Sequence, residues 1–488
     1  MSLSNEQQYA FDRFIKGENL VITGPGGTGK SKLIQNFVNY CNSINRKIQV
    51  TALTGCAALL LGGDAKTIHS WSGIKLCRGN NSDIISQAQR SKYVKKNWTS
   101  TKTLIIDEAS MMSMKMFNVL DQIGKEIRMN NRPFGGIQIV LACDFYQLPP
   151  VENPNDSESG QFCFESKNWY NIFPLENHIV LTKIFRQTDL EYIKILNEVR
   201  TGELSEESIQ TLNTYLKRTY DEKEHNGIAL TRLFPTRNRV DTLNEKMFNE
   251  LEDSSKKYKC LVTTDHSNYC DSGRAIETEK LKVCQKLSLR EIENEVQQLT
   301  NNSPCVSELN LKVGAAVLCN ANIDMDKGIC NGSQGVIVDF VGEQKIPRVK
   351  FLNGIIMLMS RHNWQSEQYP TISINQYPLQ LAWALTIHKI QGTTLDIAQI
   401  DIGRDIFAYG QSYVALSRLK SLKGLYLSCF MADRVKANPK VIEFYKNIPP
   451  IKISSPMSNN DSIFKSFELQ EETIDEPCPD KNIKVIRI

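Results

Sequence analysis

The chain has 488 residues, 41% of them apolar, and its 58 basic side chains nearly balance 54 acidic ones to leave a net charge of +4. This length and composition predict a globular protein of several domains, and the small net charge confines any nucleic-acid site to a local groove. The thirteen cysteines form no C-x-x-C pair, and no apolar run approaches the roughly 18 residues of a membrane span, so we expect an intracellular protein of the nucleus or cytoplasm with no membrane partner and no targeting segment.

Residues 3–11 predict a capped amphipathic helix that carries a candidate nucleotide contact, Gln7. A carboxamide both donates and accepts hydrogen bonds, which suits recognition of the adenine edge. Without the motif that follows it, Gln7 would be interpreted as a solvated helix residue.

That motif is a glycine loop between a strand and a helix. Apolar residues over 19–23 predict the strand, and apolar residues recur at helical spacing over 32–38. The loop consists of Gly24, Pro25, Gly26, Gly27, Thr28, Gly29, Lys30 and Ser31. Glycines let backbone N–H groups converge on a phosphate, while Lys30 is placed to reach the β- and γ-phosphates and Ser31 to hold Mg²⁺. The loop predicts binding of ATP and Mg²⁺.

Two polar segments follow the next strand, which we predict over residues 48–52. Thr54 and Gly55 end this strand, and Thr67 and His69 lie in the following loop. Small residues let a nucleic-acid backbone approach closely, and hydroxyls bond phosphates. These four residues are candidate DNA contacts, with ordinary close packing as the structural alternative.

An apolar run over residues 103–106 ends in two carboxylates, Asp107 and Glu108. Such a run is typical of a buried parallel strand that delivers side chains to a cleft. We expect Asp107 to bind Mg²⁺ through water and Glu108 to orient and deprotonate the attacking water. A second carboxylate favours an ATPase over a phosphotransferase, which need not activate water.

A further buried strand, predicted over residues 137–142, precedes a polar segment. There Gln147 is a candidate sensor of the γ-phosphate, and Phe145 and Pro149 are candidate contacts to nucleic acid. One strand that carried both would couple the two sites. Four such strands with intervening helices predict a parallel, doubly wound sheet with ligands at the carboxyl ends of its strands.

Together these motifs resemble the PIF-type, RecD-like helicases of superfamily one, a 5′-to-3′ branch. The resemblance rests on the glycine loop, Thr54-Gly55, Thr67-Ile68-His69-Ser70, Asp107-Glu108 and Asp144-Phe145 with Gln147-Leu148-Pro149-Pro150. A departure is Cys143, because members of the family usually have glycine before the Asp-Phe pair.

The resemblance extends to three later segments and implies roles for them. Arg186 follows an apolar strand, and Arg418 ends the run Tyr413-Val414-Ala415-Leu416-Ser417-Arg418; both are implied arginine fingers on the γ-phosphate. The segment 377–394 resembles the family motif that touches single-stranded DNA and the nucleotide together. Its implied DNA contacts are Thr386, His388 and Lys389, and its implied nucleotide contacts are Gln391 and Gly392.

The implied fold is α/β, with two RecA-like, doubly wound parallel-sheet motor domains and a small β-rich, SH3-like insertion in the second. We expect the first motor domain over 1–185, with a small insertion at about 72–100, and the second over 186–255 and 371–446. The inserted β-rich domain is expected over 256–370 and a flexible tail over 447–488.

The implied function is an ATP-dependent DNA helicase that moves 5′-to-3′ on single-stranded DNA and unwinds duplexes in replication, repair or recombination. Its expected substrates are single-stranded and tailed or forked duplex DNA, and we expect a monomer that works with single-strand-binding or replication proteins. Two alternatives stay open: a nucleotide-switched DNA-binding subunit that does not unwind, and a P-loop phosphotransferase.

Overall fold

The computed structural model describes residues 3–451, except 63–64, 76, 154–155, 217, 225–228, 265–280, 283, 304, 325 and 367–368. Most of the expected tail, from residue 452 on, lies outside the described residues. Among the residues described, no helix combines the length and the apolarity needed to cross a lipid bilayer.

The N-terminal part of the chain forms a six-stranded sheet in the order β3-β2-β4-β5-β1-β6, and every neighbouring pair is parallel. Its strands are β1 (Leu20–Thr23), β2 (Ile48–Ala52), β3 (Lys66–Thr67), β4 (Thr103–Asp107), β5 (Gln138–Cys143) and β6 (His178–Val180). Strands β4 and β5 are buried along their whole length because helices cover both faces of the sheet. The carboxyl ends of β1, β4 and β5 therefore open side by side.

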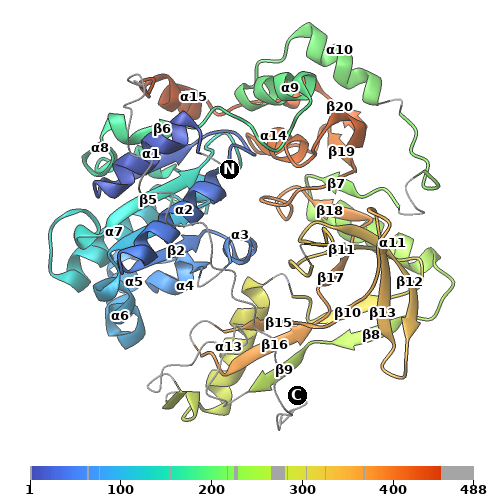
Figure 1. Cartoon of the computed structure of the whole chain (residues 1–488), viewed down its shortest axis with the longest axis horizontal. Helices are drawn as coiled ribbons and strands as arrows, with labels where there is room; N and C mark the ends of the chain where they lie inside the picture. Colours follow the sequence, from blue (N-terminus) through green and yellow to red (C-terminus); the bar gives the residue numbers. More distant parts are fainter. Residues whose placement is uncertain are drawn as a thin grey trace.

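Several helices of this domain begin after a residue whose side chain accepts from a free N–H group of the first turn. Ser4 and Gln7 form a capping box on α1, and Ser113 caps α7. The helices are α1 (Asn5–Ile15), α2 (Lys30–Ser43), α3 (Gly55–Leu61), α4 (Ile68–Ser72), α5 (Asn81–Arg90), α6 (Lys92–Ser100), α7 (Met114–Arg128) and α8 (Trp169–Ile172). The small insertion expected at about 72–100 corresponds to α5 and α6, which pack beside α7 (Figure 1).

A second parallel sheet, in the order β18-β7-β19-β20, follows in the chain. It consists of β7 (Arg232–Phe234), β18 (Ala384–Thr386), β19 (Ala398–Ile402) and β20 (Leu425–Phe430). Its helices are α9 (Leu190–Thr201), α10 (Glu206–Tyr215), α11 (Arg237–Glu250) and α14 (Gln411–Leu416). The long excursion between β7 and β18 forms the inserted domain at the lower right of Figure 1.

The inserted domain is built from antiparallel sheets around its own core. Its elements are β8 (Lys256–Lys259), β9 (Leu261–Thr264), α13 (Leu289–Asn302), β10 (Glu308–Leu311), β11 (Ala316–Cys319), β12 (Gln334–Val341), β13 (Ile346–Phe351), β14 (Ile356–Leu358), β15 (His362–Gln365), β16 (Ile372–Gln376) and β17 (Leu379–Leu381). The expected end at residue 370 falls short, because β16 pairs with β9 and β15, and β17 pairs with β11. The strand pairing of the inserted domain thus continues to Leu381.

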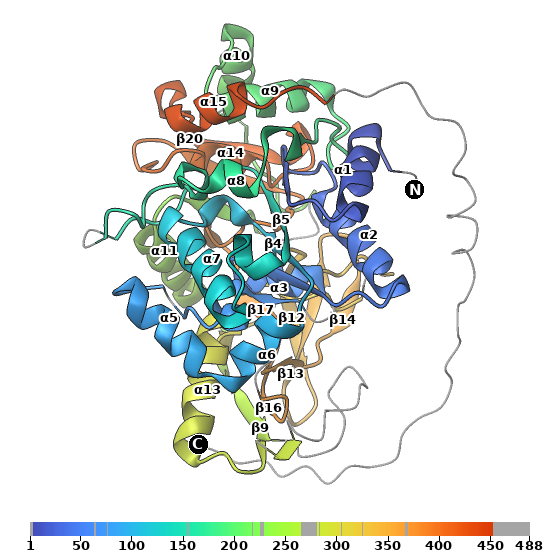
Figure 2. The ribbon, with the colours of Figure 1, turned by 90° about the vertical axis from the view of Figure 1, so that its left-hand side faces the viewer.

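The last described helix, α15 (Pro439–Lys446), returns to the first domain (Figures 1 and 2). Phe444 stacks on Phe164 with ring centroids 4.4 Å apart, and Lys440 forms an ion pair with Glu165. Residues 439–446, which we expected in the second motor domain, therefore pack as part of the first.

Candidate functional site

The glycine loop turns sharply from β1 into α2. Gly29 is the N-cap of α2 at φ 80°, and a Cβ there would lie 2.7 Å from Nε2 of Gln7. Gly27, at φ 87°, would place a Cβ 2.6 Å from Cβ of Arg186. Both positions need glycine for its backbone and for the close approach of a second segment. Thr28 braces the loop, its hydroxyl donating to the carbonyl of Pro25 at 2.9 Å.

Lys30 lies among the carboxylates of two neighbouring strands. Its ammonium donates to the carbonyls of Gly24 at 2.7 Å and Pro25 at 3.0 Å. Burial lowers the pKa of Lys30, and the charges of Asp144, Glu108 and Asp107 oppose that shift. The ends of β1, β4 and β5 thus bring the expected lysine and acidic residues together, while Ser31 stands exposed at the start of α2.

Asp107 and Glu108 occupy different environments at the end of β4. Burial, together with the neighbouring charge of Glu108, raises the pKa of Asp107 to about 7. Glu108 has φ 54° and ψ 34°, and this left-handed backbone is costly for a residue with a side chain. Its Oε2 accepts a hydrogen bond from Nε2 of Gln391 at 3.1 Å. The strained turn aims Glu108 at the second domain.

Both expected arginine fingers face the glycine loop. A Cβ placed on Gly26 would lie 3.6 Å from Nη1 of Arg186 and 3.8 Å from Nη2 of Arg418. Arg418 is 2% exposed, and burial followed by the charge of Arg186 lowers its pKa to about 10. A half-buried and a fully buried cation beside amide N–H groups form a site suited to a highly charged anion such as a triphosphate.

Gln147 and Gln391, both expected at the site, have buried amide oxygens that accept no hydrogen bond within the described part of the chain. Gln187, which sequence reasoning missed, shares this property and also donates to the carbonyl of Leu419 at 3.1 Å. An unsatisfied buried oxygen costs about 1–3 kcal/mol, so these groups are suited to a polar ligand. The available signal for Gln187 was its position directly after Arg186.

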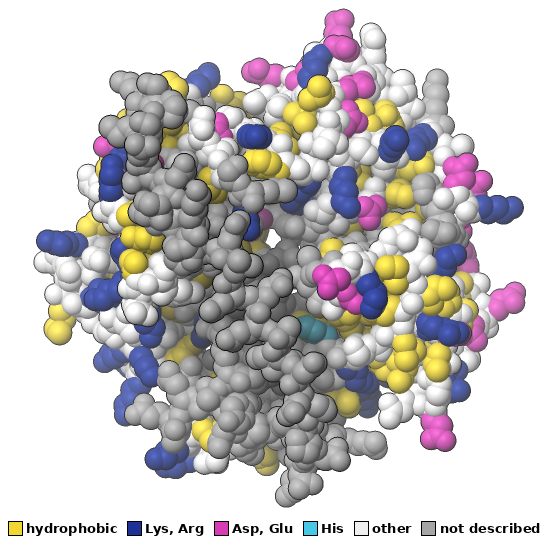
Figure 3. Space-filling model, in the orientation of Figure 1, with side chains coloured by type: hydrophobic (Ala, Val, Ile, Leu, Met, Phe, Trp, Pro, Cys, Tyr) yellow, Lys and Arg dark blue, Asp and Glu magenta, His cyan; other side chains and the backbone are white. Residues whose placement is uncertain are grey.

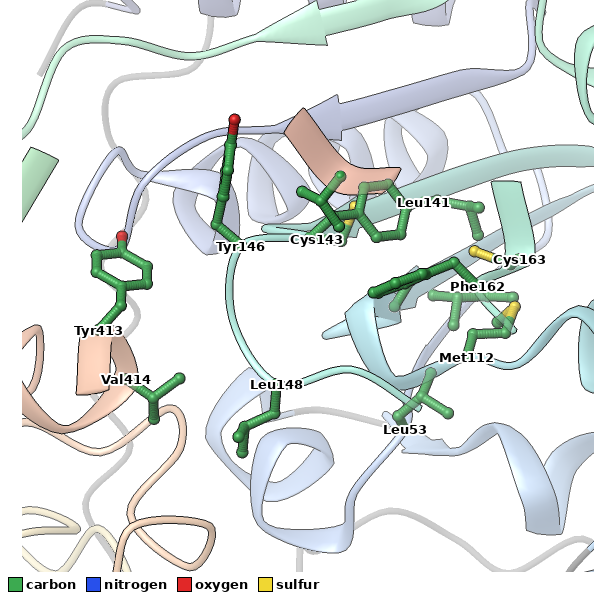
Figure 4. Packing of buried hydrophobic residues seen from close by; sticks show 14 of the residues in the cluster. Leu53, Met112, Leu141, Cys143, Tyr146, Leu148, Phe162, Cys163, Tyr413 and Val414 are labelled. Carbon is green, nitrogen blue, oxygen red and sulfur yellow. The ribbon is translucent and has the colours of Figure 1, made fainter. Parts of the chain in front are cut away.

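Tyr413 is a second residue that sequence reasoning missed. Its hydroxyl, on α14 of the second domain, accepts a hydrogen bond from the N–H of Gly26 at 3.1 Å. Figure 4 shows this hydroxyl directed at a loop of the first domain. The sequence places Tyr413 five residues before Arg418, but no local pattern indicated its partner.

Gln7 lies beside the glycine loop, as expected for a base-side contact. Its Nε2 donates to the carbonyl of Thr28 at 3.2 Å, and its Oε1 accepts from the N–H of Ser4 at 3.0 Å. The ring of Phe185, which is 46% exposed, approaches the same loop, 3.6 Å from a Cβ placed on Gly29. An exposed aromatic face next to a carboxamide suits a purine base.

Three expected DNA contacts line a groove of about 740 Å³ between the second sheet and the inserted domain. They are Thr386, His388 and Lys389, and Phe407 lines the same groove. The ring of Phe407 is 68% exposed and stacks on His388 with centroids 5.8 Å apart and planes 13° apart. Sequence reasoning missed Phe407, whose only signal was an aromatic side chain in a loop.

The first-domain candidates lie at the ends of the adjacent parallel strands β2 and β3. Gly55 begins α3, directly after Thr54, and the hydroxyl of Thr67 caps α4 by accepting from the N–H of Ser70. Burial lowers the pKa of His69 to about 4. On the face shown in Figure 3, Lys and Arg side chains predominate on the left, over this domain. The right-hand half of the same view carries both basic and acidic side chains.

The structure contradicts the expected DNA contact of Phe145. Its side chain is 1% exposed, and its ring packs edge-on against Phe162, Phe164 and Phe444. The partners of this aromatic cluster come from distant parts of the chain, so the local sequence gave no indication of burial. Pro149, in contrast, is half-buried and stays a candidate.

These features define a class of protein. Two parallel-sheet domains meet at one phosphate-binding loop, the second domain supplies cations to it, and a motif of the second sheet reaches both that loop and a surface groove. This is the architecture of a nucleotide-driven motor with two RecA-like domains.

Comparisons with known proteins give the family. The family model "PIF1-like helicase" matches residues 2–210, and "DNA helicase Pif1, 2B domain" matches residues 296–340. "ATP-dependent DNA helicase PIF1" of Danio rerio is 36% identical over 467 residues, covering 95% of this chain and 67% of the relative. The Homo sapiens protein of the same name is 35% identical over 450 residues, covering 91% of this chain and 64% of the relative. The chain thus spans about two thirds of these relatives.

Solved structures agree with this assignment. The Pif1 helicase from Candida albicans superposes with a TM-score of 0.70 at 35% identity, covering 92% of this chain and 100% of that one. Bacteroides Pif1 in complex with ADP-AlF4 gives 0.68 at 27% identity, covering 91% and 97%. The chain belongs to the PIF1-like helicase family, a family of ATP-dependent DNA helicases, and the expected fold of two RecA-like domains with a β-rich insertion is confirmed.

Proposed function

We propose that this chain hydrolyses ATP to move 5′-to-3′ along single-stranded DNA and to unwind tailed or forked duplexes. Among its relatives, Bacteroides Pif1 has been solved bound to single-stranded DNA, and another structure concerns DNA unwinding at forked duplexes by two coordinating Pif1 helicases. The observation that carries the proposal is the hydrogen bond between Gln391 and Glu108. It joins the nucleotide site to the segment whose neighbouring residues, His388 and Lys389, line the DNA groove.

In this proposal, the γ-phosphate is the element that holds the two domains together. Lys30, Gln147, Arg186 and Arg418 contact it, and their charges offset those that develop during transfer. Glu108 orients and deprotonates the attacking water, and Gln391 fixes the direction of its carboxylate. Loss of the γ-phosphate removes the anion between cations of both domains, so the domains separate.

The remaining loop residues position the nucleotide. Gly24, Pro25, Gly26, Gly27, Thr28 and Gly29 supply the phosphate cradle, Gly392 contacts the nucleotide next to Gln391, and Gln7 with Phe185 recognises the base. Mg²⁺ fits Ser31 and Asp107, because a hydroxyl and a carboxylate are hard oxygen donors and Mg²⁺ usually takes few protein ligands. The ion would neutralise phosphate charge, and it would also offset the cost of ionising the buried Asp107.

The DNA strand in this proposal crosses both domains. Thr54, Gly55, Thr67, His69 and Pro149 contact it from the first domain, and Thr386, His388 and Lys389 from the second. Because the cleft opens and closes between these two sets of contacts, alternating grip converts each ATP cycle into a step. One copy supplies all these groups, which supports a monomeric motor.

We further propose domain limits that follow the sheets. The first motor domain comprises residues up to 185 together with α15, and the second comprises 186–255 and the chain from β18 to β20. Residues 256–381 form the inserted domain. These limits differ from the sequence-based ones at two places. Strands β16 and β17 pair with strands of the inserted domain, and α15 packs against the first domain, whereas the sequence-based limits put all three in the second motor domain.

The test is unwinding of two duplexes that differ only in carrying a 5′ or a 3′ single-stranded tail. We expect ATP-dependent unwinding of the 5′-tailed duplex alone, and none by Lys30→Ala or Glu108→Gln. Equal unwinding of both duplexes would reject the polarity. Tight DNA binding without unwinding by the wild type would favour a nucleotide-switched subunit, and ATP hydrolysis insensitive to single-stranded DNA would favour a phosphotransferase.

A further inference from the structure

A buried ion pair joins helix α9 to the turn that carries Gln147. Arg200 of α9 binds the Asp144 carboxylate with both arms of its fork: Nη2 lies 2.8 Å from Oδ1, and Nε lies 3.1 Å from Oδ1 and 3.2 Å from Oδ2. The Asp144 side chain is 0% exposed and that of Arg200 is 11% exposed. A fork-to-carboxylate pair of this kind fixes direction as well as charge.

Two stacked tyrosines enclose this pair. Tyr146 and Tyr445 stack with centroids 4.7 Å apart and planes 15° apart, and the Arg200 guanidinium lies 4.4 Å and 5.2 Å from their ring centroids. The Tyr445 hydroxyl accepts from the N–H of Phe145 at 3.2 Å and bonds the hydroxyl of Thr23. The ends of β1 and β5, helix α9 and helix α15 therefore meet at Arg200.

This cluster adjoins the nucleotide site on the first-domain side. Asp144 begins the turn that leads to Gln147, whose N–H donates to the Asp144 carbonyl at 2.9 Å. Thr23 directly precedes the glycine loop. Among the charges that act on the pKa of Lys30, that of Asp144 has the largest effect.

Helix α9 also reaches both arginine fingers. It begins at Leu190, four residues after Arg186. The hydroxyl of Tyr192 on α9 donates to the carbonyl of Leu416 at 2.6 Å, two residues before Arg418. Helix α9 thus contacts the segments of both arginine fingers, and through Arg200 it also binds Asp144 in the turn that carries Gln147.

Charge balance alone does not explain an arginine here. Burial lowers the pKa of Arg200, but the charge of Asp144, the neighbouring tyrosines and the hydrogen bond to Asp144 together raise it by more, so the guanidinium stays ionised in the interior. Replacing a buried pair of this kind by neutral groups is often harmless to stability. A neutral pair would lose the orientation that the two nitrogens of Arg200, Nε and Nη2, impose on the Asp144 carboxylate.

We propose that Arg200 is a positioning residue for ATP hydrolysis, which holds Gln147 in register with Lys30 and the two arginine fingers. The proposal rests on the function proposed above. It assigns to α9 and α15 a role in the chemical step rather than in DNA contact.

The test compares Arg200→Gln, Arg200→Lys and the double variant Arg200→Gln/Asp144→Asn with the wild type, each as the full chain with saturating single-stranded DNA. We expect Arg200→Gln and Arg200→Lys to lower kcat for ATP by about tenfold or more, because misplaced catalytic groups cost up to ~10²-fold. KM for ATP should change less than about twofold. Lys440→Met, which breaks only the exposed ion pair between α15 and Glu165, is the matched control with unchanged kcat.

The double variant separates positioning from charge compensation. An Asn–Gln pair leaves no buried charge, so thermal stability should recover toward the wild type while kcat stays low. Recovery of kcat in the double variant, or an unchanged kcat in Arg200→Lys, overturns the proposal. An inactive wild type would overturn the proposed function together with this inference, whereas an unaltered Arg200→Lys beside an inactive Glu108→Gln overturns this inference alone.

Discussion

His69 shows how burial sets the chemistry of a single residue that we propose as a DNA contact. Its pKa is lowered from 6.5 to about 4 by burial, so the folded protein holds a neutral imidazole at physiological pH. A neutral ring bonds a phosphate or a base edge as a hydrogen-bond partner and releases no counterion. Lys389, by contrast, would act on DNA as a cation.

The shift at His69 predicts a pH dependence of stability. Below pH 6.5 the unfolded chain takes up a proton that the folded chain refuses until about pH 4, so folding stability falls as pH drops through this window. Chemical unfolding at several pH values should show that the wild type loses stability relative to His69→Gln between pH 6.5 and 4, with a constant difference above pH 7.5. A constant difference throughout would mean that His69 titrates normally.

At the scale of elements, the groove between the second sheet and the inserted domain depends on one loop side chain. The exposed ring of Phe407 extends the surface of His388 and offers a face to a DNA base. Base-to-aromatic stacking contributes about 1–3 kcal/mol per base. Phe407→Ala should therefore weaken binding of single-stranded DNA about fivefold or more, while Phe407→Trp should preserve it.

Fluorescence anisotropy with a labelled oligonucleotide at fixed salt measures this change. Tyr409→Ala is the matched control, since Tyr409 is a 43% exposed aromatic residue two positions along the same loop and does not line the groove. Equal losses in Phe407→Ala and Tyr409→Ala would place the effect in the loop rather than in stacking.

Elements that a short stretch of sequence defines were predictable, whereas elements that depend on contacts with distant parts of the chain were not. The glycine loop, β4 with Asp107 and Glu108, and β5 combine apolar periodicity with an adjacent polar signature, so the sequence located them. The assignment of β16 and β17 to the inserted sheets was not predictable, because they have the same alternation as any short strand and only their pairing with β9 and β11 assigns them. The sequence did not indicate the environments of Phe145, Tyr413 and Arg200 for the same reason: their contact partners lie far away in sequence.

At the scale of the whole molecule, the second domain already occupies part of the phosphate site. The Tyr413 hydroxyl holds the N–H of Gly26, and Tyr413 belongs to α14, which also ends next to Arg418. A phosphate that takes the N–H of Gly26 displaces this hydroxyl, so we expect the two domains to shift relative to each other when it binds. Nucleotide binding and domain movement are coupled through that competition.

Removing the competing hydroxyl should therefore tighten nucleotide binding. Tyr413→Phe loses one hydrogen bond of about 0.5–1.5 kcal/mol, so the Kd for ADP should fall about two- to tenfold, as measured by titration with a fluorescent ADP analogue. Tyr258→Phe, which removes a buried hydroxyl bonded to Lys345 within the inserted domain, should leave the Kd unchanged. The expected decrease in Kd assumes that the Tyr413 hydroxyl holds the two domains together and does not contact the nucleotide. A higher Kd in Tyr413→Phe would mean that the hydroxyl contacts the bound phosphate. In that case the closed arrangement of the domains persists when nucleotide is present.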